Sequence, residues 1–280
     1  MTVDVDGWSS LLRFYGVEHD ASMVDAQVNV EAGVSRLLDL FANHGISTTF
    51  FVTGDMASRH PHMVKTIDKK GHEVACHGLY HWKDEFLLTR TEQKRRIEKA
   101  TSIIQEIIGT RPLGFRAPCL KANRDTLNVL SESGYLYDSS VIPTFIPGYY
   151  GYLNSNFKPY WLPLNLHGKK KPDFFLEMPV SVNPLLFIPL SASWMRNLGS
   201  LWIKFGIRAN FILGNPVVFY IHPRDVLTLP RVEGVPSHVY RNVGAKSIEM
   251  LDCVLGYAKS LDGVFLRAID LAVLLNEERM

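Results

Sequence analysis

The sequence lacks the features that identify several classes of protein. It has three cysteines in 280 residues, Cys76, Cys119 and Cys253, and their number and spacing suit neither a disulfide framework nor a zinc finger. Its 30 basic and 28 acidic residues leave a net charge of +2, too small to indicate nucleic-acid binding. No basic and apolar leader follows Met1, and Arg and Pro interrupt the apolar stretch 183–221 too often for it to span a bilayer. We therefore expect a soluble, cytoplasmic protein without a transmembrane segment.

The composition is that of a folded α/β protein. Hydrophobic residues make up 46% and charged residues 21%, which excludes a disordered chain. Short apolar runs alternate with stretches of helical periodicity, a pattern typical of parallel β/α architecture. Seven or eight such units over residues 1–280 predict a single barrel domain. A doubly wound open sheet is the alternative architecture. It is less favoured because no glycine-rich phosphate loop follows the first strand. The expected strands are 2–6, 47–53, 72–77, 113–117, 135–138, 174–180, 216–222 and 263–267.

Segments between the strands divide into helices and long loops. Residues 7–30 and 143–173 have no periodicity, so we expect long loops of the kind that form lids or rims. Residues 183–213 form an apolar insertion, which predicts a surface for a partner or a membrane. Asn123 is suited to cap a helix and Gly45 to end one. The expected helices are 31–44, 61–70, 91–108, 123–133 and 244–260.

Ionisable residues stand at the ends of four predicted strands. Asp4 and Asp6 end the first strand, and His77, Arg116 and His222 end later ones. Strands buried on both faces are otherwise apolar, so these exceptions are informative. In a parallel β/α barrel the C-terminal strand ends meet at the edge where active sites form. We therefore expect the five side chains to converge.

The chemistry of these residues suggests a metal-dependent hydrolase. Asp4 and Asp6 share one strand face, where two carboxylates repel unless a cation or proton accompanies them; the alternative is a helix cap or a lysine pair. His77 and His81 have the i, i+4 spacing that can hold one divalent ion, although this spacing is common by chance. One Asp and two His leave coordination positions open for water and substrate.

The remaining two strand-end residues suit supporting roles in such a site. Arg116, if buried, needs a carboxylate partner, and Asp4 would be held ionised by it; a surface arginine is the alternative. His222 suits protonation of a leaving group, or else it is a hydrogen-bonded core histidine.

Taken in order, these motifs resemble the NodB-homology polysaccharide deacetylases, carbohydrate esterase family four. The likeness rests on Asp4-x-Asp6, His77-x-x-x-His81, Phe115-Arg116-Ala117-Pro118 and Tyr220-Ile221-His222. It implies a deformed (β/α) barrel of seven or eight units. By similarity, Asp4 is the general base, Arg116 its tether and His222 the general acid. Asp6, His77 and His81 would bind one divalent metal, zinc first and cobalt, nickel or manganese next.

Several residues depart from the commonest form of that family. Val5 separates the two aspartates, a spacing similar to the branch that holds peptidoglycan-deacetylase-like, allantoinase-like and lipid-linked-sugar deformylase enzymes. The backbone N–H of Cys119 is expected to stabilise the oxyanion, with Glu177 as a substitute for a missing Asp-x-x-Trp motif. Trp8 and Trp82, each next to a motif, are expected at the substrate.

The resemblance implies that a metal-bound water removes an N-acyl group, expected to be acetyl, from an amino sugar or glycan. Two alternatives stay open. One is hydrolysis of a non-sugar amide or cyclic ureide, and the other is a catalytically silent barrel that binds glycans or a membrane surface through 183–213. A lipid-linked substrate, a peripheral place on the inner face of the membrane and a homo-oligomer are compatible with the sequence.

Overall fold

The computed structural model of the chain describes residues 1–146, 150–151, 156–162 and 175–278. These residues contain ten strands, eight of them in one sheet. The sheet is made of β1 (Thr2–Val5), β2 (Thr49–Val52), β3 (Glu73–Cys76), β4 (Gly114–Phe115), β5 (Tyr137–Asp138), β8 (Tyr160–Trp161), β9 (Leu176–Glu177) and β10 (Tyr220–Ile221). The two others, β6 (Phe145–Ile146) and β7 (Tyr150–Gly151), form a separate antiparallel pair.

The sheet curls into a deformed barrel, as predicted. Its order is β10-β1-β2-β3-β4-β5-β9-β8, and all neighbours are parallel except the β8–β9 pair. Beyond β9 the chain links the two ends of the curl. Val180 N donates to Val141 O beyond β5 (2.8 Å), and Ser181 N donates to Val218 O ahead of β10 (2.9 Å).

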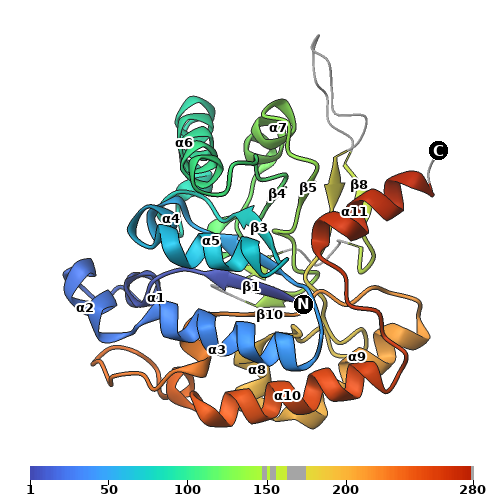
Figure 1. Ribbon diagram of the computed structural model, residues 1–280. Helices are drawn as coiled ribbons and strands as arrows, with labels where there is room; N and C mark the ends of the chain where they lie inside the picture. Colours follow the sequence, from blue (N-terminus) through green and yellow to red (C-terminus); the bar gives the residue numbers. More distant parts are fainter. Residues whose placement is uncertain (147–149, 152–155, 163–174, 279–280) are drawn as a thin grey trace.

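Helices surround the curled sheet on its outer side (Figure 1). Among the described residues, no helix combines the length and apolarity needed to cross a membrane. The α-helices are α1 (Trp8–Phe14), α2 (Ala21–Gln27), α3 (Val30–Asn43), α4 (Gly54–Arg59), α5 (Pro61–Lys69), α6 (Arg90–Ile108), α7 (Arg124–Glu132), α8 (Ala192–Leu198), α9 (Ser200–Ile212), α10 (Ala245–Lys259) and α11 (Ala268–Glu277). Short 3₁₀ turns are η1 (Glu85–Leu87), η2 (Pro118–Leu120), η3 (Pro223–Val226) and η4 (Ser237–Tyr240).

The alternation of side chains along β1 separates the core from the barrel interior. Val3 and Val5 are fully buried in the main apolar cluster, which joins the sheet to the surrounding helices. Asp4 points to the opposite face of the strand, and Asp6 follows on that face just beyond its end. Apolar packing on one face therefore fixes the two carboxylates on the other.

Most predicted elements are confirmed, with their ends moved by a few residues. The predicted helix caps are also present. The Asn123 side chain accepts a hydrogen bond from Thr126 N (2.9 Å) at the start of α7. Gly45, with φ +58°, follows α3 in the left-handed conformation.

Three predictions about the connections were wrong. Residues 7–30 are not an aperiodic loop, because they contain α1 and α2. Asp25 of α2 accepts hydrogen bonds from Ser9 N (2.7 Å) and Ser9 Oγ (2.9 Å) in the first turn of α1. This contact between the two helices stabilises both, and no local periodicity could reveal it.

Residues 183–213 are likewise not an insertion. They include α8 and α9, which connect β9 to β10 as the helical part of that β/α unit. Residues 263–267 form no strand but lead directly into α11. There Ala268 N donates to Thr49 Oγ1 (2.7 Å) and Ile269 N to Glu73 Oε2 (3.0 Å). The expected loop 143–173 lies partly outside the described residues.

Candidate active site

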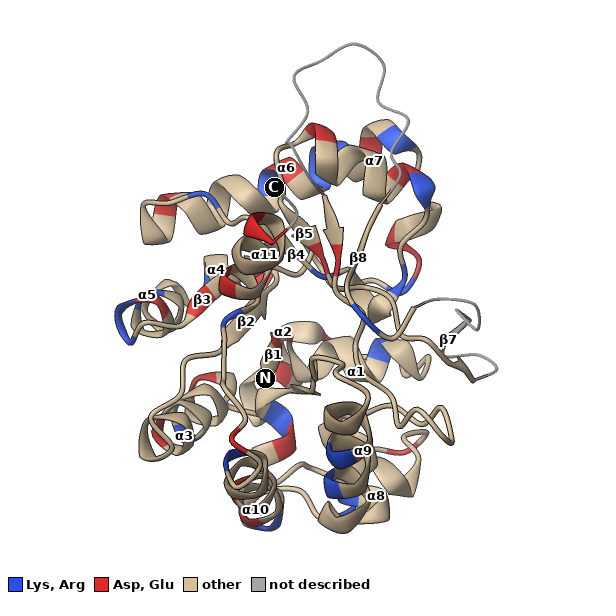
Figure 2. Ribbon diagram, turned by 90° about the vertical axis from the view of Figure 1, so that its right-hand side faces the viewer, with Lys and Arg blue, Asp and Glu red and all other residues tan. Residues whose placement is uncertain are grey.

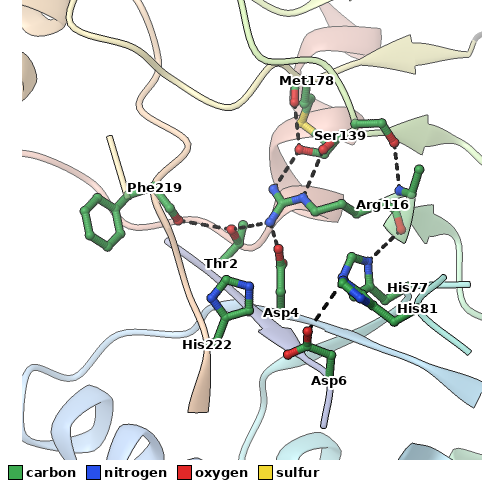
Figure 3. A network of polar contacts seen from close by, with 12 residues as sticks. Thr2, Asp4, Asp6, His77, His81, Arg116, Ser139, Met178, Phe219 and His222 are labelled. Carbon is green, nitrogen blue, oxygen red and sulfur yellow. Dashed lines mark hydrogen bonds and ion pairs between the residues drawn. The ribbon is translucent and has the colours of Figure 1, made fainter. Parts of the chain in front are cut away.

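A pocket of about 150 Å³ opens at the C-terminal ends of β1, β3 and β10. Five side chains predicted from the sequence contribute to its wall, namely those of Asp4, Asp6, His77, His81 and His222. Figure 3 shows them pointing toward one another from separate segments of the chain. The strand ends thus bring carboxylates and imidazoles together around one open pocket.

Asp4 is held by Arg116 at the back of the pocket. Arg116 Nη1 donates to Asp4 Oδ1 (2.6 Å) and to Thr2 Oγ1 (2.8 Å), and the guanidinium is fully buried. Its remaining donors go to Ser139, from Nε to the carbonyl (2.9 Å) and from Nη2 to Oγ (2.8 Å). Burial by itself raises the pKa of Asp4, but Arg116 and the nearby histidines bring that pKa below its usual range. Asp4 is therefore a buried, ionised carboxylate.

His77 presents one nitrogen to the pocket. Its Nδ1 lies 2.8 Å from the carbonyl oxygen of Arg116, which can only accept, so Nδ1 carries the proton. The other nitrogen, Nε2, is buried and has no hydrogen-bond partner in the described structure. Histidine ligands of metals are commonly fixed in this way by a backbone carbonyl.

Asp6 and His81 supply further donor atoms beside His77. His81 Nε2 lies 3.5 Å from Asp6 Oδ2, and the rings of His77 and His81 are 4.9 Å apart. Asp6 Oδ2 and His81 Nδ1 are both buried without a hydrogen-bond partner among the described residues. Burial lowers the pKa of His81 to about 3 and also lowers that of His77, so both rings are neutral. Neutral imidazole is the form that binds metals.

The donor atoms of Asp6, His77 and His81 are of the kinds that bind a divalent cation, but they are not placed at ligand distances from one common point. Buried polar atoms normally find partners, and the orphaned oxygen and nitrogens face one pocket. However, no three His, Cys, Asp or Glu side chains in the described ranges are positioned to hold a metal ion as they stand. The other oxygen of Asp6, Oδ1, accepts a short hydrogen bond from Arg224 Nη1. The Arg224 guanidinium is thus a cation already paired with the Asp6 carboxylate.

The sequence analysis missed three charged residues of this site. Arg224 and Asp225 follow His222 after Pro223, and both are buried in the pocket wall with Arg196 of α8. Asp225 Oδ2 accepts from His222 N (2.9 Å) and lies 3.4 Å from His222 Nδ1. Asp225 Oδ1 pairs with Arg196 Nη2 (2.9 Å). Two adjacent charges after a strand-end histidine were the available signal, whereas nothing local pointed to Arg196.

The residues expected at the oxyanion and the substrate divide into two groups. Cys119 lies in the pocket wall, in a left-handed conformation with φ +55°, and burial raises the pKa of its thiol to about 12. Trp8, Trp82 and Glu177 are absent from the pocket wall. Trp8 is buried in a separate apolar cluster against Tyr240. These placements do not support the substrate contacts expected for the two tryptophans and Glu177.

Trp82 and Glu177 instead have partners outside the pocket. Trp82 stacks on Tyr80 (ring centroids 5.2 Å apart), with the Arg96 guanidinium 4.4 Å from its ring. Glu177 Oε1 accepts from Val141 N (3.0 Å), and the fully buried side chain is hydrogen-bonded to Asp138. Burial and the charge of Asp138 raise the pKa of Glu177 well above its usual range. Glu177 is therefore a protonated acid in the barrel wall.

The sequence is similar to polysaccharide and peptidoglycan deacetylases. A family model described as polysaccharide deacetylase matches residues 21–137, which include His77, His81 and Arg116. A peptidoglycan deacetylase-like protein of Gibberella zeae is 35% identical over 111 residues, 39% of this chain and 32% of its own length. The peptidoglycan deacetylase of Helicobacter pylori is 26% identical over 199 residues, 69% of this chain and 64% of its own length. The chain thus spans less than two thirds of these curated relatives.

Solved structures share the fold over nearly the whole chain. A polysaccharide deacetylase homologue from Mycobacterium smegmatis has a TM-score of 0.68 at 23% identity and covers 100% of this chain and 90% of its own. Puue allantoinase has a TM-score of 0.65 at 21% identity, covering 97% of this chain and 88% of its own. At these identities the likeness establishes the fold alone. The family model and the sequence relatives show that residues 21–137 belong to the polysaccharide deacetylase family with NodB homology, and the shared fold extends over nearly the whole chain.

Proposed function

We propose that this protein is a metal-dependent hydrolase that removes an N-acyl group, acetyl first, from an amino sugar of a glycan. The observation that carries the proposal is the pair of orphaned atoms, Asp6 Oδ2 and His77 Nε2, beside a separate ionised carboxylate, Asp4. Membership in the polysaccharide deacetylase family supports a glycan as the substrate.

Asp6, His77 and His81 would hold a divalent cation, zinc first, with cobalt, nickel and manganese as alternatives. Such a cation, when bound, makes a water molecule more acidic and polarises the acyl carbonyl. The neutral state of both histidines and the proton on His77 Nδ1 leave lone pairs available for it. The Asp-x-Asp spacing remains the basis for expecting the branch that includes lipid-linked sugar enzymes.

Asp4 is the proposed general base. Arg116 keeps it ionised, and its place in the pocket wall lets it accept a proton from the attacking water. His222, just beyond the end of β10, the parallel neighbour of β1, is the proposed general acid for the leaving nitrogen, and Asp225 orients it. The backbone N–H of Cys119 is the proposed donor to the oxyanion.

The experiment is a turnover assay on zinc-loaded protein. Acetate release is measured from N-acetylglucosamine oligomers and from peptidoglycan fragments, with allantoin hydrolysis in parallel. We expect acetate from the sugars, a loss of roughly 10²- to 10⁴-fold in Asp4→Asn with zinc still bound, and loss of zinc in His81→Ala. Full turnover in Asp4→Asn contradicts the proposed base.

A cyclic ureide is the second candidate substrate. Puue allantoinase has the same fold, and this is the observation that favours including allantoin in the assay. If the protein hydrolyses allantoin and releases no acetate from any sugar, the substrate is a cyclic ureide and not a glycan. Absence of turnover on all three substrates, with zinc bound, favours a silent barrel.

A further inference from the structure

Exposed apolar side chains gather in one part of the chain. Of eighteen large apolar residues exposed in the described structure, nine lie between residues 185 and 213, about a tenth of the sequence. Scattered exposed apolar residues are normal, whereas such a concentration marks a surface that is covered in the working protein.

The exposed residues of α9 lie on a single stripe of the helix. Leu201, Phe205 and Ile212 are 78%, 48% and 69% exposed, and their spacing of four and then seven residues places them above one another. The opposite side of α9 carries its buried residues, among them Ile203 and Ile207. The helix is thus apolar on both sides, one side packed on the barrel and the other facing outward.

A turn near α9 also exposes apolar side chains. Leu185, Leu186 and Phe187 are 65%, 57% and 42% exposed. The turn follows Val182, whose carbonyl oxygen accepts from Asn210 Nδ2 (2.9 Å) on the buried side of α9, opposite the exposed stripe. We call the exposed stripe of α9, made of Leu201, Phe205 and Ile212, the α9 face.

The charged residues of the segment that carries the α9 face are all basic. No Asp or Glu occurs between Glu177 and Asp225, a stretch that contains Lys204 and Arg208. Figure 2 accordingly shows basic but no acidic residues on α8 and α9. Arg208 is exposed and falls on the same stripe as Leu201 and Ile212, with its guanidinium 6.0 Å from the Phe211 ring. Lys158 adds a further exposed cation near Gly214 at the end of α9.

We propose that the α9 face seats the protein on the surface of an anionic lipid bilayer. A helix that lies in a membrane interface combines an exposed apolar stripe with Lys and Arg at its sides, and anionic headgroups attract those cations. A second copy of the chain fits less well. A symmetric dimer through this face would place Lys204 and Arg208 against the same cations of the partner.

Membrane seating also bears on access to the pocket. Ser193 and Arg196 of α8, the helix that precedes α9, form part of the pocket wall. The helical pair that contacts the bilayer would therefore be continuous with one wall of the pocket. The docking proposal itself does not depend on the hydrolase activity, because vesicle binding is measured without a substrate.

The test is flotation with vesicles, using the full chain. Vesicles of phosphatidylcholine with 30% phosphatidylglycerol (roughly the anionic share that generates an appreciable surface potential) are compared with pure phosphatidylcholine at low salt. We expect the protein to float with the anionic vesicles. The triple variant Leu201→Ser/Phe205→Ser/Ile212→Ser should lose at least about tenfold in partitioning, and Lys204→Glu/Arg208→Glu should lose the preference for anionic lipid.

The matched control replaces three apolar residues of similar or greater exposure elsewhere, Met23→Ser/Leu87→Ser/Val264→Ser, whose exposures are 67%, 68% and 82%. It should bind vesicles as the native protein does. Equal flotation of the α9 variant and the native protein overturns the proposal, as does failure of the native protein to float. A native dimer in light scattering that the α9 variant converts to monomer, without vesicle binding, assigns the face to a second copy and likewise overturns it.

Discussion

Arg224 and Asp6 form a buried ion pair at the centre of the pocket, through Arg224 Nη1 and Asp6 Oδ1. The other oxygen of the same carboxylate faces His81 Nε2 at 3.5 Å. Burial raises the pKa of Asp6, but Arg224 and the histidines bring it below its usual range. The Asp6 carboxylate therefore pairs with the Arg224 guanidinium through one oxygen and faces the imidazoles of His81 and His77 with the other.

We expect Arg224→Gln to bind zinc more tightly than the native protein, by about tenfold. A guanidinium beside Asp6 repels a divalent cation and competes for the carboxylate, and about 1.4 kcal/mol corresponds to that factor. Competition with a chromophoric chelator measures the affinity. Asp6→Asn, which removes the carboxylate charge, should bind more weakly than either protein. Weaker zinc binding by Arg224→Gln would mean that Arg224 positions Asp6 for the metal.

Asp225→Asn tests the orientation of His222. Asp225 joins His222 to Arg196, so the substitution should lower kcat by roughly 10- to 100-fold, while KM changes much less. Zinc affinity should stay near the native value, because Asp225 is not among the proposed ligands. Since the pair with Arg196 is buried, circular dichroism must first show that the variant folds. An unchanged kcat in folded protein would remove Asp225 from the positioning role.

Glu177→Gln tests the protonated acid in the barrel wall. Because the pKa of Glu177 is raised in the folded protein, the folded state holds a proton that the unfolded chain releases above the ordinary glutamate pKa of 4.5. Stability of the native protein should therefore fall as the pH rises above that value. Glutamine has no such proton to lose and its carbonyl oxygen can still accept from Val141 N.

Urea unfolding at pH 5 and pH 8 measures this difference. We expect Glu177→Gln to gain at least about 1 kcal/mol on the native protein between the two pH values, since one pKa unit corresponds to about 1.4 kcal/mol. Glu233→Gln, an exposed glutamate, is the control and should follow the native curve. Parallel curves for Glu177→Gln and the native protein would show that Glu177 is ionised in the fold.

The sequence was sufficient to predict the barrel and to predict that the residues at the strand ends lie together. Apolar strands and helical periodicity are local properties, and the C-terminal ends of parallel strands meet whatever the loops do. This is why Asp4, Asp6, His77 and His222 could be expected in one pocket. Arg116 could be paired with Asp4 because a buried guanidinium needs a carboxylate.

The rest of the site depends on contacts that span long stretches of sequence. Arg196 lies on α8 and its side chain forms part of the pocket wall. The apolar composition of residues 183–213 had led us to expect an insertion there and not a helix beside the pocket. Trp8 stands next to Asp6 in sequence, but α1 turns its ring into an apolar cluster with Tyr240. Proximity to a motif therefore did not indicate proximity to the pocket, since the direction of a side chain is set by the element that carries it.

Gly114→Ala should destabilise the barrel at a single contact. A Cβ atom on Gly114 of β4 would lie 2.0 Å from Tyr137 Cζ and 2.1 Å from its hydroxyl oxygen. Tyr137 is fully buried and its hydroxyl donates to Glu73 Oε1 (2.8 Å), so the ring has no room to move. We expect a loss of about 3 kcal/mol or more in the free energy of unfolding, measured in urea. Gly256→Ala is the matched control, because Gly256 lies in α10 with no atom within 4 Å of an added Cβ, and alanine there should stabilise by up to about 1 kcal/mol. Equal stability of the two variants would mean that β4 and β5 are not packed as closely as Tyr137 and Gly114 indicate.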